Sequence, residues 1–167
     1  MSKLILKSSK LHSLNDSENV DLGVYNLDLA QFKLPKAMVV QKEGTSSRVV
    51  KEKNSVGELV ETGKYNLFFE VYDRAFIEII LNNGGTEIGS PTTIVIEGQD
   101  SLPILDNYED GEFIPITFTN LNVRPKKVQK KIFVGQGKPM AESWIYADIK
   151  VVADSYVTGD VNEPKAK

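Results

Sequence analysis

The sequence predicts an all-β protein, either a small OB-like barrel or a β-sandwich, with flexible termini. Three observations indicate this class: short runs of β-branched and aromatic residues recur, Asn- and Gly-rich turns separate them, and no segment shows a convincing helical period. The chain has 167 residues, of which 41% are hydrophobic, so it is long enough to bury a core. We expect a flexible N-terminal arm over residues 1–20, a single β domain over 21–157 and a flexible C-terminal tail over 158–167.

The clearest strand signal is the stretch "KYNLFFEVYD" at 64–73. Alternation places Leu67, Phe69 and Val71 on one face of that strand, with polar and aromatic residues on the other. Asn and Gly in "NNGGTEIGSP" are typical of a turn between strands, because both residues tolerate positive φ. Five further strands are predicted from the same kind of pattern, over residues 75–81, 92–98, 112–121, 126–135 and 143–154.

Pro115 lies inside the predicted strand 112–121, and because proline lacks an N–H it indicates an edge strand or a bulge there.

Weaker signals precede these strands along the chain. The stretch "LDLAQFKL" is compatible with a single helical turn. The weaker strands are predicted over 23–29, 36–44, 47–53 and 56–63.

The sequence offers little for catalysis or metal binding. It has no cysteine, and its one histidine, His12, lies in a polar N-terminal segment. The stretch "GQGKP" at 135–139 lacks the ending of a phosphate-binding Walker loop. The acidic stretch "DNYEDGE" at 106–112 lacks the spacing of a calcium loop and is interpreted as a solvated turn. We therefore expect no enzymatic activity, no catalytic residues, no metal and no cofactor.

Targeting signals are also missing from the sequence as given. No apolar run approaches the roughly 18–20 residues that span a bilayer. The N-terminal stretch "MSKLILKSSKLHS" lacks the long hydrophobic region of a secretory signal. We expect a cytoplasmic protein without membrane contact.

Positive charge is concentrated in "RPKKVQKKIFVGQGKP" at 124–139. No Asp or Glu occurs between Glu112 and Glu142, whereas the rest of the chain carries 14 cations against 23 carboxylates. Such a cationic track attracts phosphate backbones, with an affinity that falls with salt. An alternative is an edge strand whose lysines only discourage aggregation. The six cations are Arg124, Lys126, Lys127, Lys130, Lys131 and Lys138.

Aromatic residues accompany these cations. On the strand that contains the lysines, Phe133 is expected beside Lys131, and Trp144 and Tyr146 share one face of the last strand. Tyr72, with Phe68, forms a similar pair on the strand 64–73. Exposed rings next to lysines are the ingredients of single-strand recognition, at about 1–3 kcal/mol per stacked base. The alternative is that these rings pack inside a sheet covered on both faces.

Three stretches resemble the single-strand-binding-like proteins encoded beside the transfer genes of Gram-positive conjugative transposons, a family that includes a helicase processivity factor. They are "GKYNLFFEVYDR" at 63–74, "SLPILDNYEDGEFIPITFTNLNV" at 101–123 and "ESWIYADIKVVAD" at 142–154. The resemblance covers about residues 60–155. It implies a cytoplasmic protein of a phage or mobile element that coats unwound DNA during replication, recombination or transfer.

The leading hypothesis is therefore a non-enzymatic single-stranded DNA-binding protein that forms homo-oligomers and works with replication or helicase proteins. Its binding residues would be the six cations together with Phe133, Trp144, Tyr146 and Tyr72. One alternative is a structural or assembly protein of a phage, a β-sandwich with no nucleic-acid role. A third reading is a carbohydrate- or peptide-binding module, since Trp and Tyr platforms also bind sugars.

Overall fold

The computed structural model describes residue 5 and residues 21–159 of the chain. The predicted arm over 1–20, which includes His12, and the predicted tail over 158–167 lie almost entirely outside these residues. The chain separates into two compact units. The first unit combines the chain up to Lys33 with Asn122–Val151, and the second combines Leu34–Leu121 with the chain from Val152 onward. The single domain expected over 21–157 stays a prediction.

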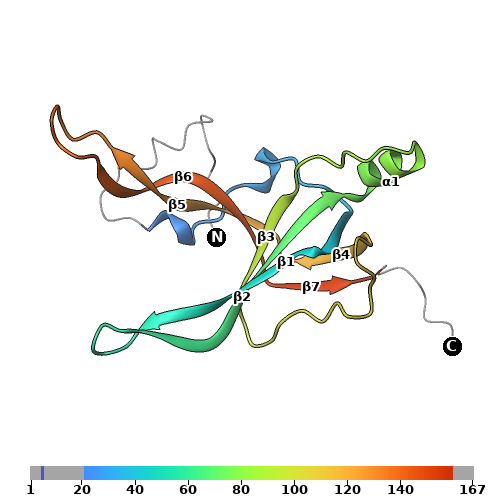
Figure 1. Ribbon diagram of the computed structural model, residues 1–167, viewed down its shortest axis with the longest axis horizontal. Coiled ribbons are helices and arrows are strands. Elements are labelled where there is room, and N and C mark those ends of the chain that lie inside the picture. Colours follow the sequence, from blue (N-terminus) through green and yellow to red (C-terminus); the bar gives the residue numbers. More distant parts are fainter. Residues whose placement is uncertain (1–4, 6–20, 160–167) are drawn as a thin grey trace. The chain divides into compact units, whose positions relative to one another are not determined.

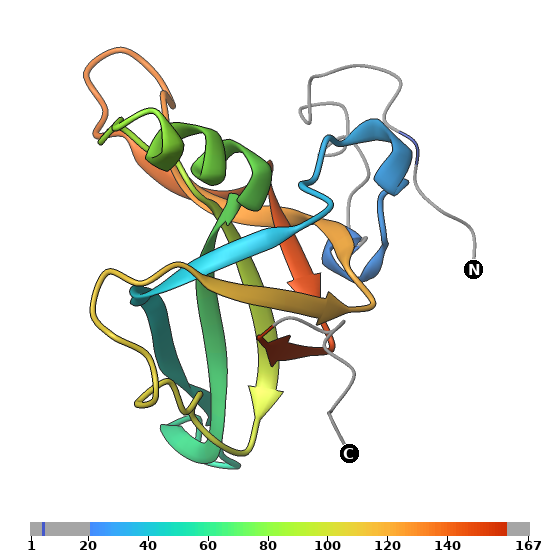
Figure 2. The ribbon, with the colours of Figure 1, turned by 90° about the vertical axis from the view of Figure 1, so that its right-hand side faces the viewer.

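The second unit is built on a five-stranded sheet in which every pair of neighbouring strands is antiparallel. This confirms the all-β class. Among the described strands of this unit the first and last in the order do not pair, so the sheet is not closed into a barrel. Figure 2 shows these strands side by side. In spatial order they are β3 (Thr92–Gln99), β2 (Leu59–Asp73), β1 (Met38–Lys53), β4 (Ile114–Thr119) and β7 (Ser155–Thr158).

The core of the second unit centres on Phe69, which is fully buried. Its ring centroid lies 5.6 Å from that of Phe118 on β4 and 4.8 Å from that of Tyr156 on β7. Leu67 and Val71 are buried on the same strand, which confirms the inward face predicted for 64–73. Aromatic rings at these separations stabilise a core by more than their area alone.

Strand β1 includes most of the weak strand predicted over 36–44 and all of that predicted over 47–53. The register against β2 shifts between Val40 and Thr45, which marks a bulge rather than a strand end. The predicted strands 56–63 and 64–73 are likewise one strand, β2. At these irregularities the alternation of apolar and polar residues is interrupted, so each strand was predicted as two. The hydrogen-bonded ladder nevertheless continues through them.

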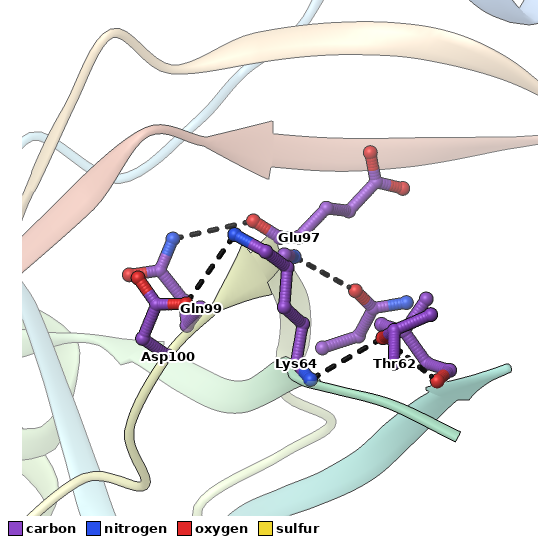
Figure 3. A network of polar contacts seen from close by, with 8 residues as sticks. Thr62, Lys64, Glu97, Gln99 and Asp100 are labelled. Carbon is purple, nitrogen blue, oxygen red and sulfur yellow. Dashed lines mark hydrogen bonds and ion pairs between the residues drawn. The ribbon is translucent and has the colours of Figure 1, made fainter.

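A network of hydrogen bonds and an ion pair lies where the pairing of β3 with β2 ends (Figure 3). Gly98 adopts φ +67° in a β3 bulge, and its N–H donates to Asn66 Oδ1 at 3.0 Å. The Thr62 hydroxyl donates to the carbonyl of Val50 at 3.0 Å, and Lys64 pairs with Asp100 at 3.3 Å. Beyond this network, the described strands β1 and β2 continue alone to the pair Lys53–Leu59, as a two-stranded arm.

The predicted strand 75–81 is wrong, because this segment is the helix α1 (Arg74–Asn82). The Asp73 side chain caps it by accepting hydrogen bonds from the N–H groups of Ala75 and Phe76. A salt bridge of 2.9 Å between Arg74 and Glu78 supports the first turn. The β-branched composition indicated a strand, but the cap and the packing of the chain decided for a helix. No helix in residues 21–159 is long and apolar enough to cross a membrane.

Strand β4 confirms the strand predicted over 112–121, but it is not an edge strand, since β1 and β7 flank it. The last pair of the β4–β7 ladder is Ile116–Thr158, and the carbonyl of Pro115 accepts from the N–H of Gly159 at 2.8 Å. Pro115 therefore lies at the end of this ladder. Its missing N–H interrupts no pairing there.

The first unit contains two neighbouring strands, β5 (Asn122–Ile132) and β6 (Ala141–Ala153). The last two residues of β6 belong to the second unit. Strands β5 and β6 confirm the strands predicted near 126–135 and 143–154. The strand predicted over 23–29 is wrong. That segment forms two short 3₁₀ turns, capped by Asp21 and Asp28, with one bridge from Leu27 to Val123. The turns are η2 (Leu22–Val24) and η3 (Leu29–Gln31), and η3 confirms the expected helical turn.

We predict that Phe69→Ala destabilises the protein by about 3–5 kcal/mol, because it leaves a cavity against Phe118 and Tyr156. Phe76→Ala is the matched control, since this ring is 51% exposed on α1 and its loss should cost under about 1 kcal/mol. Urea unfolding of both variants measures the difference. Equal losses of unfolding free energy would contradict the assigned core.

Candidate nucleic-acid interface

Figure 1 shows the strands β5 and β6 of the first unit and the loop 133–140 that connects them. This β5–β6 ribbon is rich in positive charge. Residues 122–151 carry seven cations and two carboxylates, in a chain whose formal net charge is −3. The carboxylates, Glu142 and Asp148, are both on β6. The cations are the six predicted ones together with Lys150.

Two side-chain contacts between the strands define one face of this ribbon. The Lys127 ammonium lies 5.0 Å from the centroid of the Tyr146 ring, over its face. The Gln129 amide donates a hydrogen bond to the Glu142 carboxylate. These contacts place Lys127 and Gln129 of β5 beside Tyr146 and Glu142 of β6, whereas Lys126 of β5 reaches Asp148 of β6.

Strand alternation places two further residues on that face, Lys131 of β5 and Trp144 of β6. We call this surface the Trp144 face; it consists of Lys127, Gln129 and Lys131 with Glu142, Trp144 and Tyr146. Lys130 falls on the opposite face of β5. The predicted cations are thus divided between the two sides of the ribbon, and only some of them accompany the aromatic rings.

Two of the predicted aromatic residues are open to solvent. The Trp144 side chain is 64% exposed, and Phe133, which follows β5 directly, is 68% exposed. Their exposure is confirmed, and their role in stacking stays a prediction.

The predicted cations differ in what surrounds them. Lys130, Lys131 and Lys138 are exposed and have no ion pair within the described part of the chain. Lys126 lies 3.8 Å from Asp148 in a half-exposed pair. Such surface pairs contribute little energy, so this lysine stays accessible to another anion.

Arg124 is the least available of the cations. Its Nε donates a hydrogen bond of 2.9 Å to Asn26 Oδ1, and its side chain is half-buried. The contact connects the start of β5 to the segment between the two 3₁₀ turns. A structural role for Arg124 is therefore visible, whereas its predicted contact with a phosphate is untested.

The predicted exposure of Tyr146 is wrong, because this side chain is only 5% exposed. Its hydroxyl donates to the Asp21 carboxylate at 2.7 Å. The same oxygen accepts hydrogen bonds from the N–H groups of Leu22, at 2.8 Å, and Gly23, at 3.2 Å. The turn at residues 21–24 encloses the hydroxyl of this buried side chain, while the side chain of Trp144, two residues away, remains exposed.

Asp21 is the residue that sequence reasoning missed. The hydrogen bond from the Tyr146 hydroxyl, then that from the Gly23 N–H, hold the pKa of the Asp21 carboxyl below its ordinary value of 3.8. The positive charges of Lys127 and Lys150 act in the same direction. An Asp followed by Leu-Gly is a signal for a capped turn, but nothing in the sequence shows its contact with a tyrosine 125 residues away.

Tyr72 belongs to the second unit and is described within it. Its ring lies edge-on to Phe113, with centroids 6.1 Å apart and planes at 88°. The side chain is half-buried. This geometry is ordinary packing of two aromatic residues. The predicted role of Tyr72 in stacking bases stays a prediction.

The chain matches no protein-family model, no curated protein and no solved structure in the comparisons made. Within residues 21–159, no group of three or more His, Cys, Asp or Glu side chains is placed to hold a metal ion. The case for a function therefore depends on the ribbon itself: exposed rings, unpaired lysines and a tyrosine covered by a short turn.

We predict that Tyr146→Phe raises the pKa of Asp21 toward 3.8, because it removes the hydrogen bond that contributes most to the lowered value. An NMR titration of the Asp21 carboxyl carbon measures this. Since the folded pKa is depressed, the contact stabilises the turn above pH 3.8, and this is lost as pH falls through the lower, folded value.

Tyr25→Phe is the control for this titration, because Tyr25 is a neighbouring tyrosine whose side chain is exposed. It should leave the pKa of Asp21 unchanged. An Asp21 pKa that is the same in wild type and Tyr146→Phe would contradict the hydrogen bond described here.

Proposed function

We propose that this protein binds single-stranded DNA, without catalysis and without strong sequence preference, through the Trp144 face and the loop 133–140. One observation carries the proposal. Trp144 is 64% exposed on a ribbon with seven cations and two carboxylates. Strand alternation places it on one face with Lys131, which has no ion pair among the described residues. Aromatic faces that stack bases and cations that follow the backbone are the two elements of sequence-independent recognition.

The aromatic rings and the lysines would have different roles in binding. Trp144 and Phe133 would stack bases, which is sequence-tolerant because every base has a flat π face. Lys131 and Lys138 would neutralise phosphates. The Glu142 carboxylate, on the same face, disfavours a phosphate beside it. We therefore expect the backbone to follow β5 and the loop rather than the start of β6.

The wider setting follows as part of the same proposal. A protein of this kind would coat unwound DNA during replication, recombination or transfer of a phage or mobile element, in the cytoplasm. Partners would be single-stranded DNA, further copies of the chain and replication or helicase proteins. The resemblance of residues 60–155 to single-strand-binding-like proteins supports this setting.

A second candidate is a structural or assembly protein of a phage. The observation that favours it lies in the second unit, where the two-stranded arm exposes Val56 and Leu59 at its end. Exposed apolar side chains of this kind mark protein contacts. Rings or tubes in electron micrographs, from a protein with no affinity for oligonucleotides, would support this candidate instead.

The direct test of DNA binding is a fluorescence titration with oligo(dT). Trp144 is the only tryptophan, so quenching of its emission reports a base stacked on it. If Lys131 and Lys138 each neutralise a phosphate, affinity should fall roughly sevenfold between about 50 and 200 mM salt. No binding at the lower salt concentration would remove the proposal.

We predict that Lys131→Gln weakens binding to a dye-labelled oligo(dT) roughly threefold and reduces the salt slope by about 0.7, the share of one phosphate contact. Trp144→Leu should weaken binding by about 1–3 kcal/mol, the value of a stacked base. Fluorescence anisotropy measures both variants.

Lys53→Gln is the matched control, since this exposed lysine lies on the arm of the second unit. It should leave the affinity nearly unchanged. Equal effects of Lys53→Gln and Lys131→Gln would show that the ribbon is not the binding surface.

A further inference from the structure

We infer that residues 21–24 form a displaceable cover over the Tyr146 end of the Trp144 face, and that single-stranded DNA binds more fully by displacing it. This inference rests on the proposed function and names a regulation of the same site. In the free chain, Trp144 is open and Tyr146 is closed, although alternation puts both on one face about 7 Å apart.

The cover is held by a small set of polar contacts around one oxygen atom. The Tyr146 hydroxyl donates to Asp21 at 2.7 Å and accepts from the N–H groups of Leu22 and Gly23. The Gly23 N–H also donates to Asp21 Oδ1, at 3.0 Å. The apolar contribution comes from Leu22, the one buried side chain of the turn.

The Asp21 carboxylate occupies a place that suits a phosphate. It accepts a hydrogen bond from the Tyr146 hydroxyl and lies in the field of Lys127 and Lys150. Lys127 also lies over the Tyr146 ring. A phosphate that replaces the carboxylate meets the same hydroxyl and the same two positive charges, while the Gly23 N–H leaves with the cover, so the exchange is of one anion for another. The uncovered ring would then continue the stack that begins on Trp144.

The chain is built so that the cover can move while its attachment stays. Leu27 is buried, and its N–H donates to the carbonyl of Val123 at 2.7 Å, which fixes the segment to β5. Tyr25, between this anchor and the cover, is exposed, and so is Val24 at the end of the cover. A change in backbone torsion in those residues would lift Leu22 and Asp21 from Tyr146 without breaking the Leu27 contact.

The consequence for affinity follows from a two-state equilibrium. If only the uncovered form binds completely, the apparent dissociation constant is the intrinsic one divided by the uncovered fraction. A substitution that weakens the cover raises that fraction and tightens binding. This direction is opposite to that expected for loss of an ordinary binding residue.

Amide hydrogen exchange tests the displacement in the unmodified protein, with and without oligo(dT). The N–H groups of Leu22 and Gly23 should lose protection when the oligonucleotide binds. The N–H of Leu27 is the internal control and should stay protected, since the anchor does not move. Unchanged or increased protection at Leu22 and Gly23 would overturn the inference.

Affinity measurements on variants supply the second test, by anisotropy of dye-labelled oligo(dT) at fixed salt. Asp21→Ala should tighten binding about threefold more than Asp28→Ala. The control removes the same charge from the same segment and likewise uncaps a three-residue turn, since Asp28 accepts from the Ala30 N–H.

The outcomes separate the two proposals. If wild type binds oligo(dT) but Asp21→Ala and Asp28→Ala bind equally, the cover is a fixed structural contact and DNA binding stands. Absence of wild-type binding at low salt removes both proposals.

Discussion

The hydroxyl of Tyr146 is the interaction on which the architecture of the first unit depends. One donated and two accepted hydrogen bonds join a strand near the end of the chain to a turn near its beginning. This contact decides which part of the Trp144 face meets solvent. It also explains why Asp21, an exposed residue, has a pKa held low by that same hydroxyl. A phenolic oxygen suits this position, since it donates and accepts at once while its ring fills the space beneath the turn.

The positive charge of the lysines and the exposure of Trp144 together distinguish one face of the β5–β6 ribbon from the other. A cation-rich strand is often only a protected edge, and Lys130, on the opposite side of β5 from Trp144, fits that reading. Lys131 is different because it shares its face with an exposed indole. The division of lysines between two faces means that the positive charge of residues 124–139 overstates the size of any one binding surface. It also makes the two faces chemically distinguishable.

Sequence patterns predicted much of the fold and part of the site. The inward face of Leu67, Phe69 and Val71 and the exposure of Trp144 followed from alternation, which depends only on neighbouring residues. The helix at 74–82 was missed because its β-branched residues favour a strand, whereas the Asp73 cap and burial of Ile77 favour a helix. The burial of Tyr146 could not be predicted, since its partners lie more than 120 residues away in the sequence. The long strands β1 and β2 were read as fragments because bulges interrupt their periodicity.

The central claim is that the Trp144 face receives a single strand of DNA, and NMR shift mapping with oligo(dT) tests it most directly. The account predicts that the largest changes occur at the Trp144 indole N–H and at the backbone amides around Lys131, with smaller changes along the two-stranded arm of the second unit. Changes confined to the arm, or none at an oligonucleotide concentration well above that of the protein in low salt, would contradict it.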